Sequence, residues 1–142
     1  MTPLLNAVIK YKTGYQYQLA EDYAIRTGIF PAAEIREDFI SMDRDGLLTI
    51  KKGYAWDGAS GIAIDTADFM RGSLVHDVLY QLMQDGKLSQ AWRKPADELL
   101  VQLCREDGMG DVRSWYVLKA VRAFGKQYAA ARNDSDTVKS AP

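Results

Sequence analysis

Along the first third of the chain, apolar and polar side chains alternate with a period of two, as in strands of a half-buried sheet. The alternation predicts strands at residues 4–12, 15–26, 37–42 and 47–54. The run at residues 43–46 (DRDG) separates the last two and predicts a hairpin turn. Together these elements predict a small antiparallel sheet or meander.

The period changes to that of a helix after residues 55–66 (AWDGASGIAIDT), a segment too rich in glycine for a helix and too irregular for a strand. Residues 69–84 have apolar side chains at positions 70, 74, 78, 79, 82 and 83, which predicts a helix. Asp65 or Thr66 is expected to cap its start, and Asp85-Gly86 to end it.

Two more helices are predicted downstream. After a short helical turn at residues 88–94, Pro95 suits the first position of a helix that runs to about Glu106. Residues 108–110 (GMG) then break the chain, and residues 111–131 form the last helix. Its buried side is expected to carry Trp115, Leu118, Val121 and Phe124. A sheet followed by about three helices predicts an α+β fold.

Length and composition indicate one domain. The 142 residues suit a single core over residues 1–132, and the polar segment 133–142 is predicted to be a disordered tail. The net charge of −1 argues against a large nucleic-acid interface. Four basic residues fall near one face of the last helix and predict either a local basic patch or a solvated helix surface: Arg113, Lys119, Arg122 and Lys126.

The single cysteine, Cys104, excludes an internal disulfide and a cysteine-based zinc site, and its apolar helical surroundings predict a buried, unreactive thiol. No apolar run is long enough to cross a bilayer, and the N-terminus does not resemble a signal peptide. These features predict a chain that stays in a cytoplasm unless another machine exports it.

The only histidine, His76, lies within the first predicted helix. Tyr80, four residues later, shares its helical face, whereas Asp77 is turned about 100° away. A short connection should make this helix an antiparallel neighbour of the next, so Asp97 is expected within hydrogen-bond range of His76. A carboxylate on one imidazole nitrogen leaves the other nitrogen as a base. The alternative is an ordinary packed histidine.

The glycine-rich segment before this helix is the second candidate feature. Its backbone, around Asp57, Gly58, Ser60 and Gly61, can turn carbonyls or amides inward. Inward carbonyls with the carboxylates of Asp57, Asp65 and Asp77 would suit calcium. Inward amides would instead bind an anion. The segment is equally consistent with a tight connection from sheet to helix.

Two resemblances follow from these residues. The pattern WDGASG…IDT…FMRGSLVHDVLYQLM resembles a family of short phage and prophage proteins of unknown function, and it covers most of the chain. It implies a viral or prophage origin, in the host bacterial cytoplasm or on a virion, and assigns no activity.

The local sequence HDVLY is similar to the active-site helix of secreted phospholipase A₂, which reads His-Asp-x-x-Tyr. That resemblance implies that His76 activates water, Asp77 binds calcium, Tyr80 supports the network and Asp97 orients the histidine. Asp57 and Gly58 would lie in a calcium loop, to which Ser60, Gly61 and Asp65 could contribute. The family is disulfide-bonded, and the strand-rich first half of this chain has no counterpart in it.

Two functions are therefore predicted as alternatives. One is a calcium-dependent ester hydrolase of the phospholipase A₂ type, which would meet a membrane surface. The other is a non-enzymatic phage protein, associated with the virion or tail or bound to a host protein.

Overall fold

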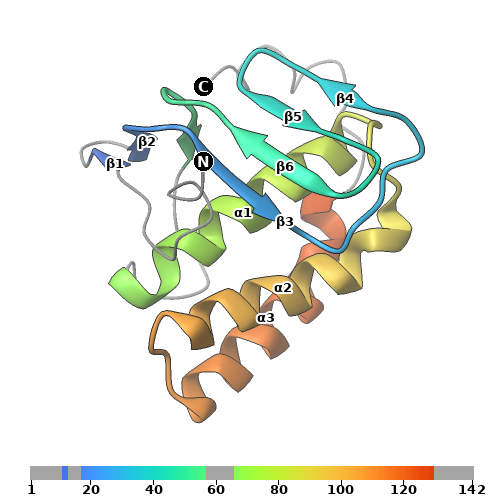
Figure 1. Ribbon diagram of the computed structural model, residues 1–142. Coiled ribbons are helices and arrows are strands. Elements are labelled where there is room, and N and C mark those ends of the chain that lie inside the picture. The colour runs from blue at the N-terminus through green and yellow to red at the C-terminus, as the bar shows by residue number, and fades with distance from the viewer. Residues whose placement is uncertain (1–10, 13–16, 57–65, 130–142) are drawn as a thin grey trace.

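The computed structural model describes residues 11–12, 17–56 and 66–129. Two antiparallel sheets precede three helices (Figure 1), so the predicted α+β class is confirmed. The predicted capping residue Asp65 and the predicted tail at residues 133–142 lie outside the described residues.

The described strands are β1 (Tyr11–Lys12), β2 (Tyr17–Leu19), β3 (Tyr23–Arg26), β4 (Ile35–Arg36), β5 (Ile40–Met42), β6 (Leu47–Ile50) and β7 (Ala55–Trp56). The smaller sheet has the order β1-β2-β7 and the larger has the order β3-β6-β5-β4. The predicted strand at residues 15–26 is wrong as one element, because its described part is divided between the two sheets. The prediction that residues 55 and 56 are irregular is also wrong, since they pair with β2.

The predicted hairpin at residues 43–46 joins β5 to β6, and local chemistry explains it. The Oδ1 atom of Asp43 accepts the backbone amides of Asp45 at 2.9 Å and Leu47 at 3.0 Å. Gly46 has a φ of +88°, and a Cβ atom there would lie 2.8 Å from the carbonyl oxygen of Ile29. Only glycine suits this position.

The helices are α1 (Ala67–Gln84), α2 (Arg93–Glu106) and α3 (Asp111–Ala129), with a short 3₁₀ turn, η2 (Gln90–Trp92), before α2. Thr66 occupies the N-cap position of α1, but its hydroxyl bonds to the side chain of Asp68 and not to a backbone amide. Pro95 is the third residue of α2 because η2 runs directly into the helix. Among the described residues, no helix is long and apolar enough to cross a membrane.

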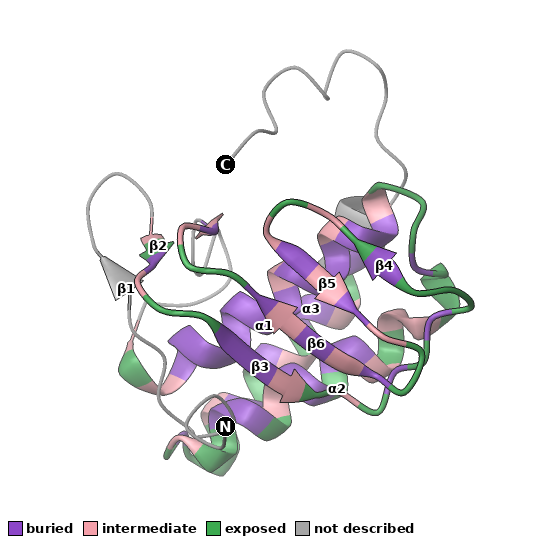
Figure 2. Cartoon of the chain, turned by 45° about the horizontal axis from the view of Figure 1, so that its top comes forward, coloured by how far each residue is buried: buried purple, intermediate pink, exposed green. Residues whose placement is uncertain are grey.

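Helix α1 is buried around most of its circumference, which its position explains (Figures 1 and 2). One core joins the larger sheet to α1 and α2 through residues such as Leu48, Ile50 and Leu79. A second core, which includes Leu100 and Val117, joins the three helices. Helix α1 therefore carries its side chains into the centre of the molecule.

The predicted buried side of α3 is wrong in part. Trp115 is 60% exposed and Leu118 is half-buried, whereas Val121 is buried as expected; the side chain of Phe124 is outside the described set. The buried face consists of smaller side chains: Ser114, Val117, Ala120 and Val121. Small residues let α3 approach its neighbours closely, and a search for large apolar residues misses that face.

Candidate functional site

The imidazole of His76, on α1, meets the carboxylate of Asp97, on α2, inside the helical layer. The Nε2 atom of His76 lies 2.7 Å from Oδ1 of Asp97. His76 is 8% exposed and Asp97 is completely buried. The two helices pack side by side across the short connection at residues 85–92. The expected contact between these two side chains is therefore confirmed.

Tyr80 completes the same face of α1, one turn after His76. Its ring lies against the imidazole, with ring centroids 4.2 Å apart and planes inclined by 34°. Its hydroxyl donates a hydrogen bond of 2.5 Å to Oδ1 of Asp97. Burial and the contact with Asp97 raise the pKa of the Tyr80 phenol, so Tyr80 remains a proton donor at neutral pH.

Two arginines approach the other oxygen of Asp97. Nη1 of Arg122, on α3, donates to Oδ2 at 2.8 Å. Nη1 of Arg93, one turn before Asp97 on α2, lies 4.0 Å from the same oxygen. One carboxylate thus connects three helices and faces two guanidinium groups.

Little in the sequence indicates that these two arginines lie beside Asp97. Arg122 belonged to the predicted basic patch or solvated surface of α3, but it turns inward to Asp97. Arg113, from the same group, pairs with Asp68 at 3.2 Å and donates to the hydroxyl of Thr66 at 2.9 Å. A basic residue at the edge of an otherwise apolar face is the one signal that could have identified Arg122.

The charge on Asp97 determines which nitrogen of His76 carries the hydrogen of their contact. Burial alone raises the pKa of Asp97, but hydrogen bonds from His76, Tyr80 and Arg122 favour the charged form more strongly. The pKa of Asp97 therefore lies below its ordinary value of 3.8, and the group is a carboxylate at neutral pH. A carboxylate accepts only, so the hydrogen of this contact lies on Nε2 of His76, and Nδ1 is the nitrogen that bears the free electron pair when the ring is neutral.

The close fit of α3 on α1 also positions Tyr80. A Cβ atom on Gly125 would touch the Tyr80 hydroxyl and lie 3.1 Å from Cζ of that ring. Glycine at this point of α3 leaves the space that the phenol needs to reach Asp97.

Asp77, the predicted calcium ligand, is half-buried on a different side of α1. Its neighbours one turn away in each direction are Ser73 and Gln81. Ser73 accepts a hydrogen bond of 3.1 Å from the indole of Trp56, and Gln81 accepts one of 2.8 Å from the hydroxyl of Tyr54. Asp77 therefore lies on the side of α1 that faces β7, the strand that leads into residue 57.

The other predicted loop residues lie outside the described residues: Asp57, Gly58, Ser60, Gly61 and Asp65. In the part of the chain that is described, no group of three or more His, Cys, Asp or Glu side chains could hold a metal ion. The described residues provide one of the predicted ligands, Asp77, whereas calcium takes six to eight oxygens.

Comparison with protein-family models, curated proteins and solved structures gives no match to this chain. No family is shown. The two resemblances therefore rest on the residues that carry them.

A second polar cluster surrounds Arg71 and holds elements of the fold together. Arg71 is buried and bonds to the Tyr23 hydroxyl at 3.0 Å, to Glu106 at 2.9 Å and to Asp107 at 3.1 Å, which joins β3 and α1 to the end of α2. Burial raises the pKa of the Tyr23 phenol, which therefore stays neutral in this cluster.

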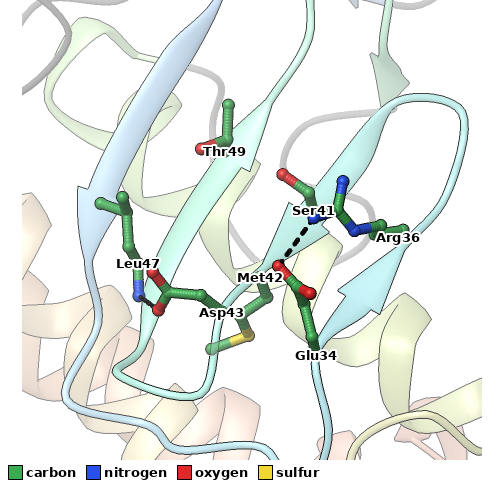
Figure 3. Close-up of a pocket in the computed structure, with 7 residues that line it drawn as sticks. All are labelled: Glu34, Arg36, Ser41, Met42, Asp43, Leu47 and Thr49. Carbon is green, nitrogen blue, oxygen red and sulfur yellow. Dashed lines mark hydrogen bonds and ion pairs between the residues drawn. The ribbon is translucent and has the colours of Figure 1, made fainter.

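A hollow of about 170 Å³ opens on the larger sheet, on the face that carries its less buried side chains (Figure 3). It is lined by Glu34, Arg36, Ser41, Met42, Asp43, Leu47 and Thr49. Glu34 is paired with Arg36 at 3.1 Å, and Asp43 is bound by the turn amides, so these groups serve the sheet itself. The buried His76–Asp97 pair is the stronger candidate for chemistry.

Proposed function

We propose that the chain is an ester hydrolase in which His76 acts as the general base and Asp97 orients it. The proposal rests on one observation, the 2.7 Å contact between Nε2 of His76 and the fully buried carboxyl group of Asp97. This contact fixes the ring and leaves Nδ1 to accept a proton, which is what a water-activating base requires. The resemblance to the phospholipase A₂ helix adds the substrate class, a lipid ester.

In the proposed reaction, a water molecule gives a proton to Nδ1 of His76 while its oxygen bonds to the ester carbonyl carbon. The π pair of the carbonyl moves onto the carbonyl oxygen, which becomes the oxyanion of a tetrahedral intermediate. Asp97 stabilises the positive charge that forms on the ring. The oxyanion then re-forms the carbonyl double bond, the bond to the alkoxide oxygen breaks, and the ring returns the proton to that oxygen. The products are an acid and an alcohol.

Tyr80 and Arg122 are positioning residues in this reaction. Tyr80 lies against the imidazole and occupies Oδ1 of Asp97 together with it, and Arg122 holds Oδ2. Asp97 is thereby fixed at both oxygens, so the ring that it binds has one orientation.

Only the resemblance to the phospholipase A₂ helix suggests a role for calcium in this proposal. When bound at Asp77 and the loop that contains Asp57 and Gly58, it would polarise the ester carbonyl. Because Asp77 alone among the described residues is a predicted ligand, the steps above use no metal ion.

The test measures hydrolysis of p-nitrophenyl esters and of phospholipid in parallel, with added calcium and with a chelator. The wild type is compared with His76→Gln, which keeps a polar side chain without a base, and with Asp111→Asn as a control at an exposed acid. His76→Gln is expected to lower the rate by about 10²-fold or more, while Asp111→Asn leaves it unchanged. Equal rates for wild type and His76→Gln would refute the proposal.

A second candidate function is favoured by the low exposure of His76 and by the way Asp97 ties three helices together. In that case the network is a structural junction, and the chain is a non-enzymatic binding protein. Its predicted setting is a phage particle, a phage tail or a complex with a host protein. Absence of hydrolysis from all assays, together with detection of the chain in purified virions by mass spectrometry or of a host partner, would favour this alternative.

A further inference from the structure

Three apolar side chains of α3 are exposed to solvent. Val112 is 83% exposed, Trp115 is 60% exposed and Tyr116 is 54% exposed. Their spacing of three and four residues places them on one side of the helix, which we call the apolar face of α3. The opposite side of α3 packs on α2 and α1, and α3 lies on the side of the helical layer away from the larger sheet (Figure 1).

The charges of α3 indicate what covers this face. Among the basic side chains of α3 that the structure describes, Arg113 and Arg122 are paired with Asp68 and Asp97, whereas Lys119 lies beside the apolar face. Asp111 is already paired with Arg105 at 2.7 Å. Lys119 lies one turn beyond the aromatic residues, with its ammonium group 5.5 Å from the centre of the Trp115 ring. Lys119 thus places one positive charge at the border of the apolar face.

The area of the face argues against a second copy of the chain. Trp and Tyr bury about 150–250 Å² each when fully covered, and here each is already about half covered. Two such rings and one valine fall short of the non-polar share, somewhat over half, of the roughly 800 Å² that each partner buries in a stable interface. Docking on a lipid surface needs a smaller apolar area, because one or two aromatic side chains can insert at the headgroup level.

We propose that the apolar face of α3 docks on an anionic lipid surface, with Trp115 and Tyr116 at the headgroup level and Lys119 on the acidic lipid. The inference deepens the proposed lipid-ester substrate class. Docking itself does not require hydrolysis, so it can be measured in the inactive His76→Gln variant.

The experiment mixes the full chain with vesicles of phosphatidylcholine alone or of phosphatidylcholine with phosphatidylglycerol, and separates bound from free protein by sedimentation. Binding is expected only with phosphatidylglycerol. Trp115→Ser/Tyr116→Ser is expected to weaken it by about tenfold or more, and Lys119→Glu by a similar factor. Phe30→Ser and Lys51→Glu, at exposed positions in the loops that follow β3 and β6, are the matched controls and should bind like wild type.

Tryptophan fluorescence adds a local readout. Trp56 is buried and Trp92 is partly buried, so a shift of emission to shorter wavelength on vesicle addition is expected to come from Trp115 and to disappear in Trp115→Phe. The proposal is overturned if the wild type does not sediment with anionic vesicles and its tryptophan emission does not shift when they are added. It is also overturned if the double variant binds like wild type, or if the wild type is a dimer that the double variant disrupts.

Vesicle binding without ester hydrolysis would support the docking surface and refute the proposed hydrolase activity. Hydrolysis of soluble esters without vesicle binding would support the activity and refute the docking surface. The same preparations of wild type and His76→Gln serve both measurements.

Discussion

Asp97→Asn removes one charge from the centre of the network and changes no volume. The amide has one accepting oxygen, whereas Asp97 accepts from His76, Tyr80 and Arg122. If the amide oxygen faces His76 and Tyr80, its NH₂ group faces the guanidinium of Arg122, donor against donor. If it faces Arg122, the NH₂ group faces His76, which must then change tautomer, and Tyr80 loses its acceptor.

The expected loss of stability follows from burial. Breaking a fully buried ion pair costs about 3–5 kcal/mol because the remaining charge is left uncompensated. The side chain of Arg122 is 34% exposed, so water screens part of its charge. We therefore expect Asp97→Asn to lower the free energy of unfolding at pH 7 by about 3 kcal/mol, near the lower end of that range.

The difference between the two proteins should depend on pH. The folded pKa of Asp97 lies below its ordinary value of 3.8, so the carboxylate stabilises the fold above that value. As the pH falls below about 4, the unfolded chain binds a proton that the folded chain does not, and this stabilisation is lost through the folded pKa. Other acidic groups, such as Glu106, titrate in both proteins and cancel in the difference.

The assay is urea unfolding of both proteins between pH 7 and pH 2.5, followed by far-ultraviolet circular dichroism. Asp111→Asn, at an exposed acid in the first turn of α3 that pairs with Arg105, is the control and should change stability by less than about 1 kcal/mol. Equal midpoints for wild type and Asp97→Asn at pH 7 would refute the reasoning. A stability gap that stayed constant down to the lowest pH would refute the linkage to Asp97.

Three further outcomes are expected. Gly125→Ala should force Tyr80 away from its acceptor and cost about 1–3 kcal/mol in a denaturant melt. Gly110→Ala has open space around its Cβ and loses only the preference for glycine at the residue before α3, so it should cost less than about 1 kcal/mol. A melt of Gly125→Ala that matched wild type would contradict the close fit. Arg71→Met should cost about 3 kcal/mol in the same melt because it strands the carboxylates around it, and a loss below about 1 kcal/mol would show that solvent already compensates them. Burial raises the pKa of the Cys104 thiol to about 12, so a thiol reagent at pH 8 should label it only after unfolding; rapid labelling of the folded protein would contradict its burial.

The helices and the hairpin were predictable because their signals are local. The apolar period of residues 69–84 and the glycines at 86 and 108 specify α1 and the ends of α1 and α2 within a few residues. The division of residues 15–26 was not predictable in the same way. That segment leaves one sheet and enters another, and pairing between distant strands has no local signal.

The candidate site shows the same division. His76, Tyr80 and Asp97 were predictable because helical spacing and one short connection place them together. Arg122 was not, because its direction depends on how α3 rotates about its own axis. That rotation is set by close packing of small residues such as Ser114 and Ala120, which hydrophobicity alone does not reveal.

The enclosure of α1 has a consequence for the order in which parts of the molecule can open. Helix α1 contacts α2 more extensively than it contacts α3, and α3 has one side in solvent. A local opening that released α3 would detach Arg122 and leave the imidazole and its carboxylate on helices that are still packed together. Amide protons at the centre of α1 would then exchange with deuterium only through global unfolding, whereas those of α3 would exchange first.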